Sequence, residues 1–252
     1  MQEVYEKIIA FIRDAGSVLV ARQREIVDIG ATKQWLTEED LRIERGLKKI
    51  IIASHPTHTL FAEEENDAFP DADDVWVADP ISGTRSYLHQ TPRYSIAVAH
   101  MHRGLVQFAA VYHPPTKELY SAYRGNGATM NGQKIYVTSG HDERPHYLFQ
   151  KTFTRRHDEW GMATLAQMRV RGDVELADGS TAMYACHVAR GDYDGMILYS
   201  KDAFPSIVTS LIIEEAGGIC TNSDGKSPIG STDRIIVLGT PTMHQRLLDA
   251  IA

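Results

Sequence analysis

Apolar residues recur at helical spacing near the start of the chain. Val4, Ile8, Phe11, Ile12 and Ala15 fall on one face of a helix expected over residues 2–22. A second amphipathic helix is expected over 38–54. From about residue 59 to 138 the pattern changes to short apolar runs between turn residues, which favours strands and hairpins. The clearest expected strands are Val75–Ala78, Ser95–His100, Val106–Tyr112 and Leu119–Tyr123.

Strands and helices alternate after about residue 140. The expected strands are Tyr147–Gln150, Gly195–Tyr199, Gly218–Thr221 and Ile235–Gly239, and the expected helices are Thr154–Met168, Ser180–Arg190, Pro205–Ala216 and Pro241–Ile251. A hairpin-rich half followed by an alternating half fits a layered α+β or α/β sandwich. We expect one unit over 1–252 with sub-halves of approximately 1–140 and 141–252, and a hinge at His141–Pro145.

The segment Val75–Thr84 carries the first chemical signal. An apolar run ends at Asp79, the sequence Pro-Ile-Ser-Gly-Thr follows as a turn, and a short polar helix is expected after it. A carboxylate at a strand end can hold a hard cation, and the N–H groups at a helix start favour an anion. Alternatively, Asp79 only caps the turn, as Asp often does before Pro.

Two further acidic segments lie upstream. Glu63–Glu65 follow an apolar strand end, where they are either cation ligands or a solvated charge run. Thr37 and Asp40 fit the capping pattern of the helix that they open, so Asp40 has a structural role without any catalysis.

These segments together resemble one family. Thr37–Asp40, Ala62–Glu64 and Asp79–Thr84 match, in order and spacing, the T-x-x-D, G-E-E and D-P-I-D-G-T motifs of the inositol monophosphatase-like family of metal-dependent phosphatases. Further matches are Ala110–Pro114, Gly125–Ala128, Asn131–Gly132, Gly179–Ala182, Val188–Gly191, Asp194–Gly195 and Glu215–Gly218. The resemblance covers nearly the whole chain. It implies an α-β-α-β-α sandwich, usually dimeric, that hydrolyses a phosphomonoester with Mg²⁺ by direct attack of water.

The resemblance also assigns roles to residues. It implies metal binding by Glu63, Asp79 and the backbone carbonyl of Ile81, and water activation by Asp40 with Thr84. Phosphate binding falls to the turn of Ser82, Gly83 and Thr84, chiefly through backbone N–H groups. Substrate binding falls to Gly179 and Thr181.

Three positions depart from the family pattern. Ser82 replaces the second Asp of D-P-I-D-G-T, and a neutral hydroxyl is a weaker Mg²⁺ ligand than a carboxylate. The Asp of the family's W-D motif falls on Pro205, which has no side-chain oxygen. Asp202 could replace it if the loop shifts, or else it caps the helix that Pro205 starts. Leu198 stands where inositol-hydrolysing members carry an acid, so inositol phosphate is a poor fit.

The composition limits the kinds of molecule that the protein is expected to bind. A formal charge of −7 argues against nucleic acid, which selects basic surfaces. No membrane segment and no targeting segment is recognised, and Cys186 and Cys220 read as buried free thiols, so we expect a cytoplasmic protein. The eleven histidines show no metal-ligand spacing. His55, His58, His100 and His102 read as surface or strand-edge residues.

Two hypotheses follow. The first is a Mg²⁺-dependent phosphomonoesterase acting on a small phosphorylated metabolite, such as a sugar or polyol phosphate other than inositol phosphate. The second is a catalytically impaired relative that binds a phosphorylated ligand or a protein partner. Ser82, Leu198 and Pro205 favour the second, and the retained Asp40, Glu63, Asp79 and Thr84 favour the first. A third possibility is that the same fold catalyses a different reaction, and the sequence does not distinguish this from the first hypothesis.

Overall fold

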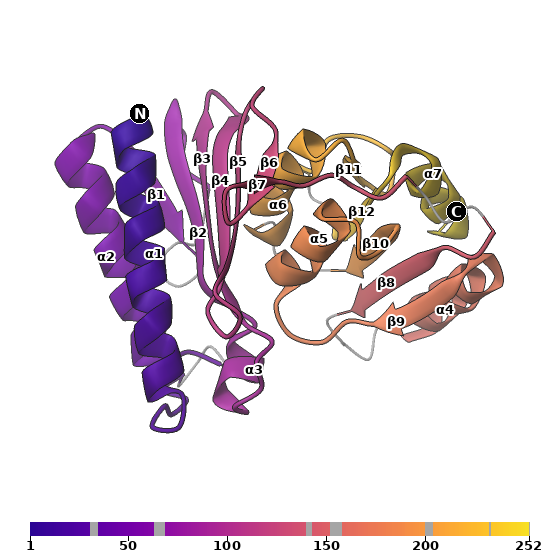
Figure 1. The fold of residues 1–252 in the computed structure, drawn as a ribbon, viewed down its shortest axis with the longest axis horizontal. Helices are drawn as coiled ribbons and strands as arrows, with labels where there is room; N and C mark the ends of the chain where they lie inside the picture. The colour runs from indigo at the N-terminus through magenta and orange to yellow at the C-terminus, as the bar shows by residue number, and fades with distance from the viewer. Residues whose placement is uncertain are drawn as a thin grey trace.

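The described residues form five stacked layers of helix and sheet in the computed structural model (Figure 1). The structure describes residues 1–30, 35–62, 69–139, 143–151, 158–199, 204–231 and 233–251. Helices α1 (Gln2–Arg22) and α2 (Glu38–Ser54) form the first layer, and a sheet of strands β1–β7 forms the second. Helices α5 (Thr181–Ala189) and α6 (Phe204–Glu215) lie between this sheet and the second sheet, β8–β12. Helices α4 (Asp158–Arg171) and α7 (Pro241–Ile251) cover the far face.

Three apolar clusters join these layers. One packs α1 and α2 against the first sheet, one fills the space around α5 and α6 between the sheets, and one packs α4 and α7 against the second sheet. Because each sheet has helices on both faces, its inner strands read as continuous apolar runs rather than alternating ones. The expected α-β-α-β-α sandwich is confirmed.

In the first sheet, neighbouring strands follow one another in the sequence, from β1 at one edge to β7 at the other. Its strands are β1 (Thr59–Ala62), β2 (Asp74–Ser82), β3 (Ser95–His102), β4 (Leu105–His113), β5 (Glu118–Tyr123), β6 (Ala128–Met130) and β7 (Gln133–Lys134). Strands β1 and β2 are parallel, and every later pair is antiparallel. On β2, Trp76 and Ala78 face α1 and α2, whereas Val75 and Val77 face the middle layer.

The second sheet has the order β11-β12-β10-β8-β9. Its strands are β8 (His146–Lys151), β9 (Asp173–Leu176), β10 (Gly195–Tyr199), β11 (Ile219–Asn222) and β12 (Ile235–Gly239). Strand β8 is parallel to both neighbours, whereas β12 is antiparallel to both of its neighbours. All strands of the first sheet precede residue 135 and all strands of the second follow residue 145. The division into sub-halves near 140 remains a prediction.

The structure corrects several predicted boundaries. Strand β2 extends to Ser82, because pairing with β3 resumes at Ser82–Ser95 after an irregularity that follows Asp79; the turn predicted from Pro80 is confined to Gly83. Strand β9 and the short strands β6 and β7 were not predicted, because β9 is half acidic and β6 and β7 are only 3 and 2 residues long. Helix α4 ends at Arg171 rather than Met168, and the predicted start of that helix lies outside the described residues.

Two further expectations concern the cysteines and the membrane. Cys186 and Cys220 are buried free thiols, as predicted. Among the described residues, no helix combines the length and apolarity needed to cross a bilayer. Residues 141 and 142 of the predicted hinge lie outside the described residues.

Candidate active site

Thr37 and Asp40 form the predicted capping box at the start of α2. Asp40 Oδ2 accepts hydrogen bonds from the backbone N–H of Thr37 at 2.8 Å and from its hydroxyl at 2.6 Å. Thr37 Oγ1 in turn accepts from the backbone N–H of Asp40 at 3.3 Å. Both residues are fully buried. The capping prediction is therefore confirmed, and the carboxylate of Asp40 is held in one orientation.

The end of β2 carries a sequence of oxygen donors. Asp79 is 5% exposed, and Ile81 and Ser82 are also buried. Gly83 follows in a left-handed conformation (φ +84°), which glycine adopts at little cost, and α3 (Thr84–Leu88) begins directly after it. Thr84 Oγ1 donates to the carbonyl of Ile81 at 2.7 Å, which fixes the side chain over the turn. The predicted short helix is confirmed.

Gly83 lies directly against the start of α5. A Cβ on Gly83 would stand 2.7 Å from the backbone nitrogen of Ser180 and 2.7 Å from the carbonyl of Arg93. The Ser180 N–H donates to that carbonyl at 3.0 Å, so the segment just before β3 is bonded to the start of α5 and lies against Gly83. The glycine at position 83 is required by both its φ and this close approach.

Other contacts fix α5 at this position. The hydroxyl of Ser180 accepts from the N–H of Met183 at 3.1 Å and so caps the helix. Ser95 Oγ lies 2.7 Å from Ser180 Oγ, and Gln150 Nε2 donates to the carbonyl of Gly179 at 2.9 Å. Thr181, the first residue of α5, is half-buried. The predicted substrate residues Gly179 and Thr181 thus lie beside the Gly83–Thr84 turn.

Helices α1 and α2 also approach this end of β2. The Tyr87 hydroxyl in α3 donates to the carbonyl of Leu19 at 3.0 Å. Burial raises the pKa of Tyr87, and the neighbouring Tyr94 and the carboxylates of Glu39 and Asp40 raise it further. Glu39, next to Asp40 at the start of α2, pairs with Arg22 at the end of α1, so the start of α2 lies on the same side of the molecule as α3.

The structure thus brings the Asp40, Asp79–Thr84 and Gly179–Thr181 segments to one end of the first sheet. Two predicted metal ligands, Glu63 and Asp202, lie outside the described residues. The donors that are described, the Asp79 carboxylate and the Ile81 carbonyl, are oxygens, which suits a hard cation such as Mg²⁺. Leu198, 2% exposed, points into the core between the sheets.

A second group of potential metal ligands was not predicted. His58, Asp74 and His100 lie together at the opposite end of β2. His100 is buried rather than exposed, because α1 covers this face of β3. The residues come from positions 58 to 100, so no local motif marks them. The available signal was the pair His100 and His102, which share one face of a strand.

Comparison with known proteins identifies the family. The sequence model that describes the inositol monophosphatase family matches residues 1–252 of this chain. The chain belongs to the inositol monophosphatase family. Its architecture is thus that of a metal-dependent phosphatase family, as the motifs indicated.

Curated relatives carry two kinds of name. The chain is 28% identical over 228 residues to the inositol-1-monophosphatase of Rhizobium meliloti, which covers 89% of this chain and 84% of that protein. It is 29% identical over 254 residues to the Nus factor SuhB of Pasteurella multocida. That alignment covers 95% of this chain and 92% of that protein. Both similarities extend over most of each chain, so they concern the whole fold.

Solved structures show the same fold. The extragenic suppressor protein suhB of Bartonella henselae has a TM-score of 0.89 at 21% identity, covering 99% of this chain and 98% of that chain. An IMPase/NADP phosphatase complexed with Mg²⁺ and phosphate has a TM-score of 0.87 at 22% identity, covering 99% and 95%. At this identity the likeness establishes the fold.

Proposed function

We propose that this protein is a Mg²⁺-dependent phosphomonoesterase that acts on a small phosphorylated metabolite. The observation that carries the proposal is the approach of Gly83 to Gly179 and Ser180. It places the start of α5 beside the turn that ends β2, next to the buried Asp79. Backbone N–H groups at helix starts favour phosphate oxygens, and a carboxylate beside them favours a cation.

Asp79, the Ile81 carbonyl and Glu63 are the proposed Mg²⁺ ligands. When bound, the ion supplies charge neutralisation and makes a water molecule more acidic. The related IMPase/NADP phosphatase structure contains Mg²⁺ and phosphate, which supports this choice of ion. Ser82 lies next to these ligands with a neutral hydroxyl, so we propose that a second cation binds weakly, with Asp202 as its tentative ligand.

Asp40 and Thr84 are the proposed residues that orient and activate the attacking water. Thr84 Oγ1 gives its hydrogen to the carbonyl of Ile81, so the lone pairs of this oxygen are available to accept a hydrogen bond from water. Asp40 is held in one orientation by Thr37 at the start of α2. A fixed acceptor for the water's proton lowers the barrier by general-base assistance.

The phosphate and the leaving group are assigned to different elements. Backbone N–H groups of Gly83 and Thr84, with the Ser82 hydroxyl, are proposed to bind the phosphate, and Gly179 and Thr181 to contact the rest of the substrate. Leu198 cannot accept a hydrogen bond from a ring hydroxyl and is buried in the core. We therefore propose a sugar or polyol phosphate other than inositol phosphate.

A second candidate is a binding protein with impaired catalysis. Ser82 favours it, because the loss of a carboxylate weakens the second cation site. Relatives named Nus factor SuhB are consistent with a role in a protein assembly. This alternative retains phosphate binding at the Gly83–Thr84 turn and omits turnover.

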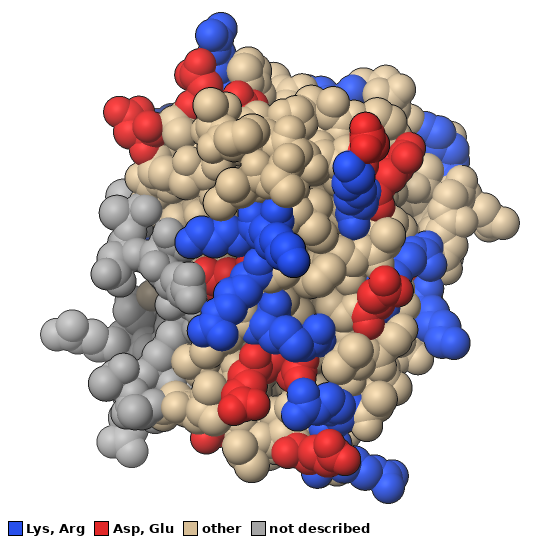
Figure 2. Space-filling model, turned by 90° about the vertical axis from the view of Figure 1, so that its left-hand side faces the viewer, with Lys and Arg blue, Asp and Glu red and all other residues tan. Residues whose placement is uncertain are grey.

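We also propose a cytoplasmic homodimer without nucleic-acid or membrane partners. The formal charge is −7, and the outer face of α1 and α2 mixes basic and acidic side chains instead of presenting one basic surface (Figure 2). Phosphate backbones select extended basic surfaces. Light scattering of the purified chain measures the oligomeric state directly.

The deciding experiment measures phosphate release from a panel of sugar, polyol and nucleotide monophosphates, with and without Mg²⁺. Mg²⁺-dependent release from one compound, lost in Asp79→Asn, is the expected result. If no compound in the panel releases phosphate, while the folded protein still binds phosphate or Mg²⁺, the result would favour the binding protein instead.

A further inference from the structure

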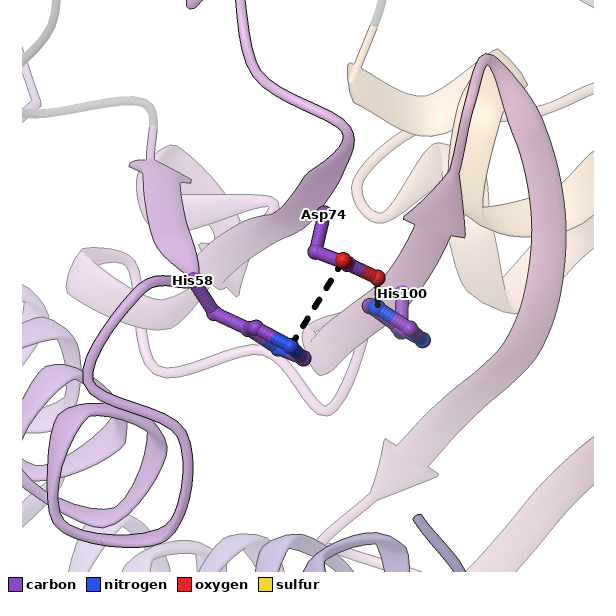
Figure 3. Close-up of side chains that lie close together, drawn as sticks. All are labelled: His58, Asp74 and His100. Carbon is purple, nitrogen blue, oxygen red and sulfur yellow. Dashed lines mark hydrogen bonds and ion pairs between the residues drawn. The ribbon is translucent and has the colours of Figure 1, made fainter.

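Four polar side chains meet at the end of β2 that is opposite to the candidate active site. Asp74 begins β2, His102 lies directly across from it on β3, and His100 lies across from Trp76. His58 immediately precedes β1, whose first residue pairs with Val75. Figure 3 shows the side chains of His58, Asp74 and His100 pointing toward one another from the three strand ends.

The ligand atoms are nearly at metal-binding spacing. Asp74 Oδ1 lies 3.1 Å from His100 Nε2 and 2.9 Å from His102 Nδ1, and Asp74 Oδ2 lies 3.8 Å from His58 Nε2. One atom from each of His58, Asp74 and His100 lies within 4.8 Å of the others. In a tetrahedral zinc site with bonds near 2.0–2.1 Å, ligand atoms are about 3.3 Å apart. To close the shell, His58 Nε2 must approach Asp74, and the rings of His58 and His100, nearly parallel with centroids 5.3 Å apart, must turn toward one ion.

The protonation states suit metal binding. Burial lowers the pKa of His100 to about 4, against the opposing hydrogen bond to Asp74. Burial also lowers the pKa of His58. Partial burial raises the pKa of Asp74, but the hydrogen bond from His102 and the nearby imidazoles bring it below its usual value. Neutral imidazoles and an ionised carboxylate are the forms that ligate metals.

Neighbouring groups orient two of the imidazoles. The Tyr5 hydroxyl lies 2.8 Å from His100 Nδ1, leaving Nε2 directed at Asp74. The indole N–H of Trp76 donates to His58 Nδ1 at 3.1 Å. An indole only donates, so His58 Nε2 carries the ring hydrogen while no metal is bound. Coordination through Nε2 must move that hydrogen to Nδ1 and break the bond to Trp76, which gives the site a tryptophan reporter.

Solvent reaches the group from one side. The side chain of Asp74 is 26% exposed and that of His102 is 46% exposed, whereas those of His58 and His100 are almost fully buried. An ion can therefore enter past Asp74 and His102 without unfolding the strand ends. The group lies five residues from Asp79 on β2, about 17 Å at strand spacing, and so is separate from the candidate active site.

We propose that His58, Asp74 and His100, with His102 as a fourth ligand, bind a divalent transition-metal ion of the zinc type. Two or three imidazole nitrogens with one carboxylate oxygen suit zinc and its neighbours rather than Mg²⁺, which prefers oxygen ligands. The bound ion would join the α2–β1 connection to the start of β2 and the end of β3. The proposal does not depend on the proposed phosphatase activity.

The test is zinc titration of the chelator-treated full chain, in millimolar Mg²⁺, by calorimetry and tryptophan fluorescence. Asp79→Asn serves as the background, so that zinc bound at the active site is not counted. We expect one zinc per chain and a change in fluorescence as Trp76 loses its hydrogen bond. Asp74→Asn or His58→Gln in this background should weaken zinc binding at least about tenfold.

A matched control is Asp173→Asn, which alters another carboxylate beside a histidine. His146 Nε2 lies 3.5 Å from Asp173 Oδ2, and Arg144 also pairs with this carboxylate at 2.7 Å. Zinc affinity should be unchanged in this variant. Equal zinc affinity in the background protein, Asp74→Asn and His58→Gln, each folded by circular dichroism, would overturn the proposal, as would absence of zinc binding. The four residues would then be a hydrogen-bonded network only.

Discussion

The two ends of strand β2 each carry an aspartate, and their surroundings differ completely. Asp79 lies among backbone carbonyls, hydroxyls and helix starts, next to Ile81, Ser82 and Gly83. Asp74 lies among imidazoles from His58, His100 and His102. The first surrounding suits a hard cation with a phosphate, and the second suits a transition metal.

The difference shows that ligand chemistry is set by what the fold brings to a carboxylate. At the Asp79 end, most partners follow within five residues, and α5 adds its start through contacts with Gly83. At the Asp74 end, every partner arrives from another element, across β-sheet pairing and the connection before β1. We therefore expect that each end can be altered without disturbing the other.

The largest effect is expected from Asp79→Asn. An amide is a poorer ligand for a hard cation than a carboxylate, so turnover should fall by at least about 10²-fold while the fold persists. Phosphate release under Mg²⁺ measures this, with circular dichroism as the check on folding. Asp224→Asn, which changes an exposed acid far along the chain, is the control and should keep full turnover. Full turnover in Asp79→Asn would contradict the proposed metal site.

Gly83→Ala should lower the free energy of unfolding by roughly 3 kcal/mol or more. Alanine is strained in the left-handed conformation of this position. Its Cβ would also lie 2.7 Å from backbone atoms of Arg93 and Ser180. Gly104→Ala is the matched control, since Gly104 also has positive φ (+76°) but nothing within 4 Å of the added Cβ. It should cost only about 1 kcal/mol. If urea denaturation gives the same loss in free energy of unfolding for Gly83→Ala and Gly104→Ala, the approach of α5 to Gly83 is not tight.

The sequence predicted the Asp79 end better than the Asp74 end for a physical reason. Turn, cap and strand-end signals are local, so Thr37, Asp40 and the Gly83–Thr84 turn were recognisable from their neighbours. The capping box and α3 are observed as predicted. The extension of β2 to Ser82 was missed, because pairing with Ser95 overrides the turn propensity of the Pro-Ile-Ser segment.

The histidine group was missed because it is purely tertiary. His58 and His100 are 42 positions apart, and two strand pairings bring them to the same carboxylate, β1 with β2 for His58 and β3 with β2 for His100. The roles of Glu63 and Asp202 are still predictions, since both lie outside the described residues. Strand β9 was missed since its sequence, Asp-Val-Glu-Leu, is half acidic.

Ser82→Asp is expected to raise turnover by roughly tenfold at saturating Mg²⁺. The substitution supplies a carboxylate at the position where the family's D-P-I-D-G-T motif has one, and should strengthen a second cation site. The Mg²⁺ dependence of phosphate release measures it. Ser82→Asn, similar in size and uncharged, is the control and should give no gain. Equal turnover in both variants would indicate that the reaction does not use a second cation.

The smallest effect is expected from Tyr5→Phe at the Asp74 end. The change removes the hydroxyl 2.8 Å from His100 Nδ1 and keeps the ring, which stacks on Phe108. Loss of one buried hydrogen bond should lower the free energy of unfolding by roughly 1–2 kcal/mol in urea denaturation with a chelator present. Tyr136→Phe, at an exposed tyrosine, should stay within about 0.5 kcal/mol of the parent. Phosphatase turnover should be unchanged in both variants, because the affected ligand group lies at the far end of β2. A loss of turnover in Tyr5→Phe alone would contradict this independence and indicate that the two ends are coupled through the strand.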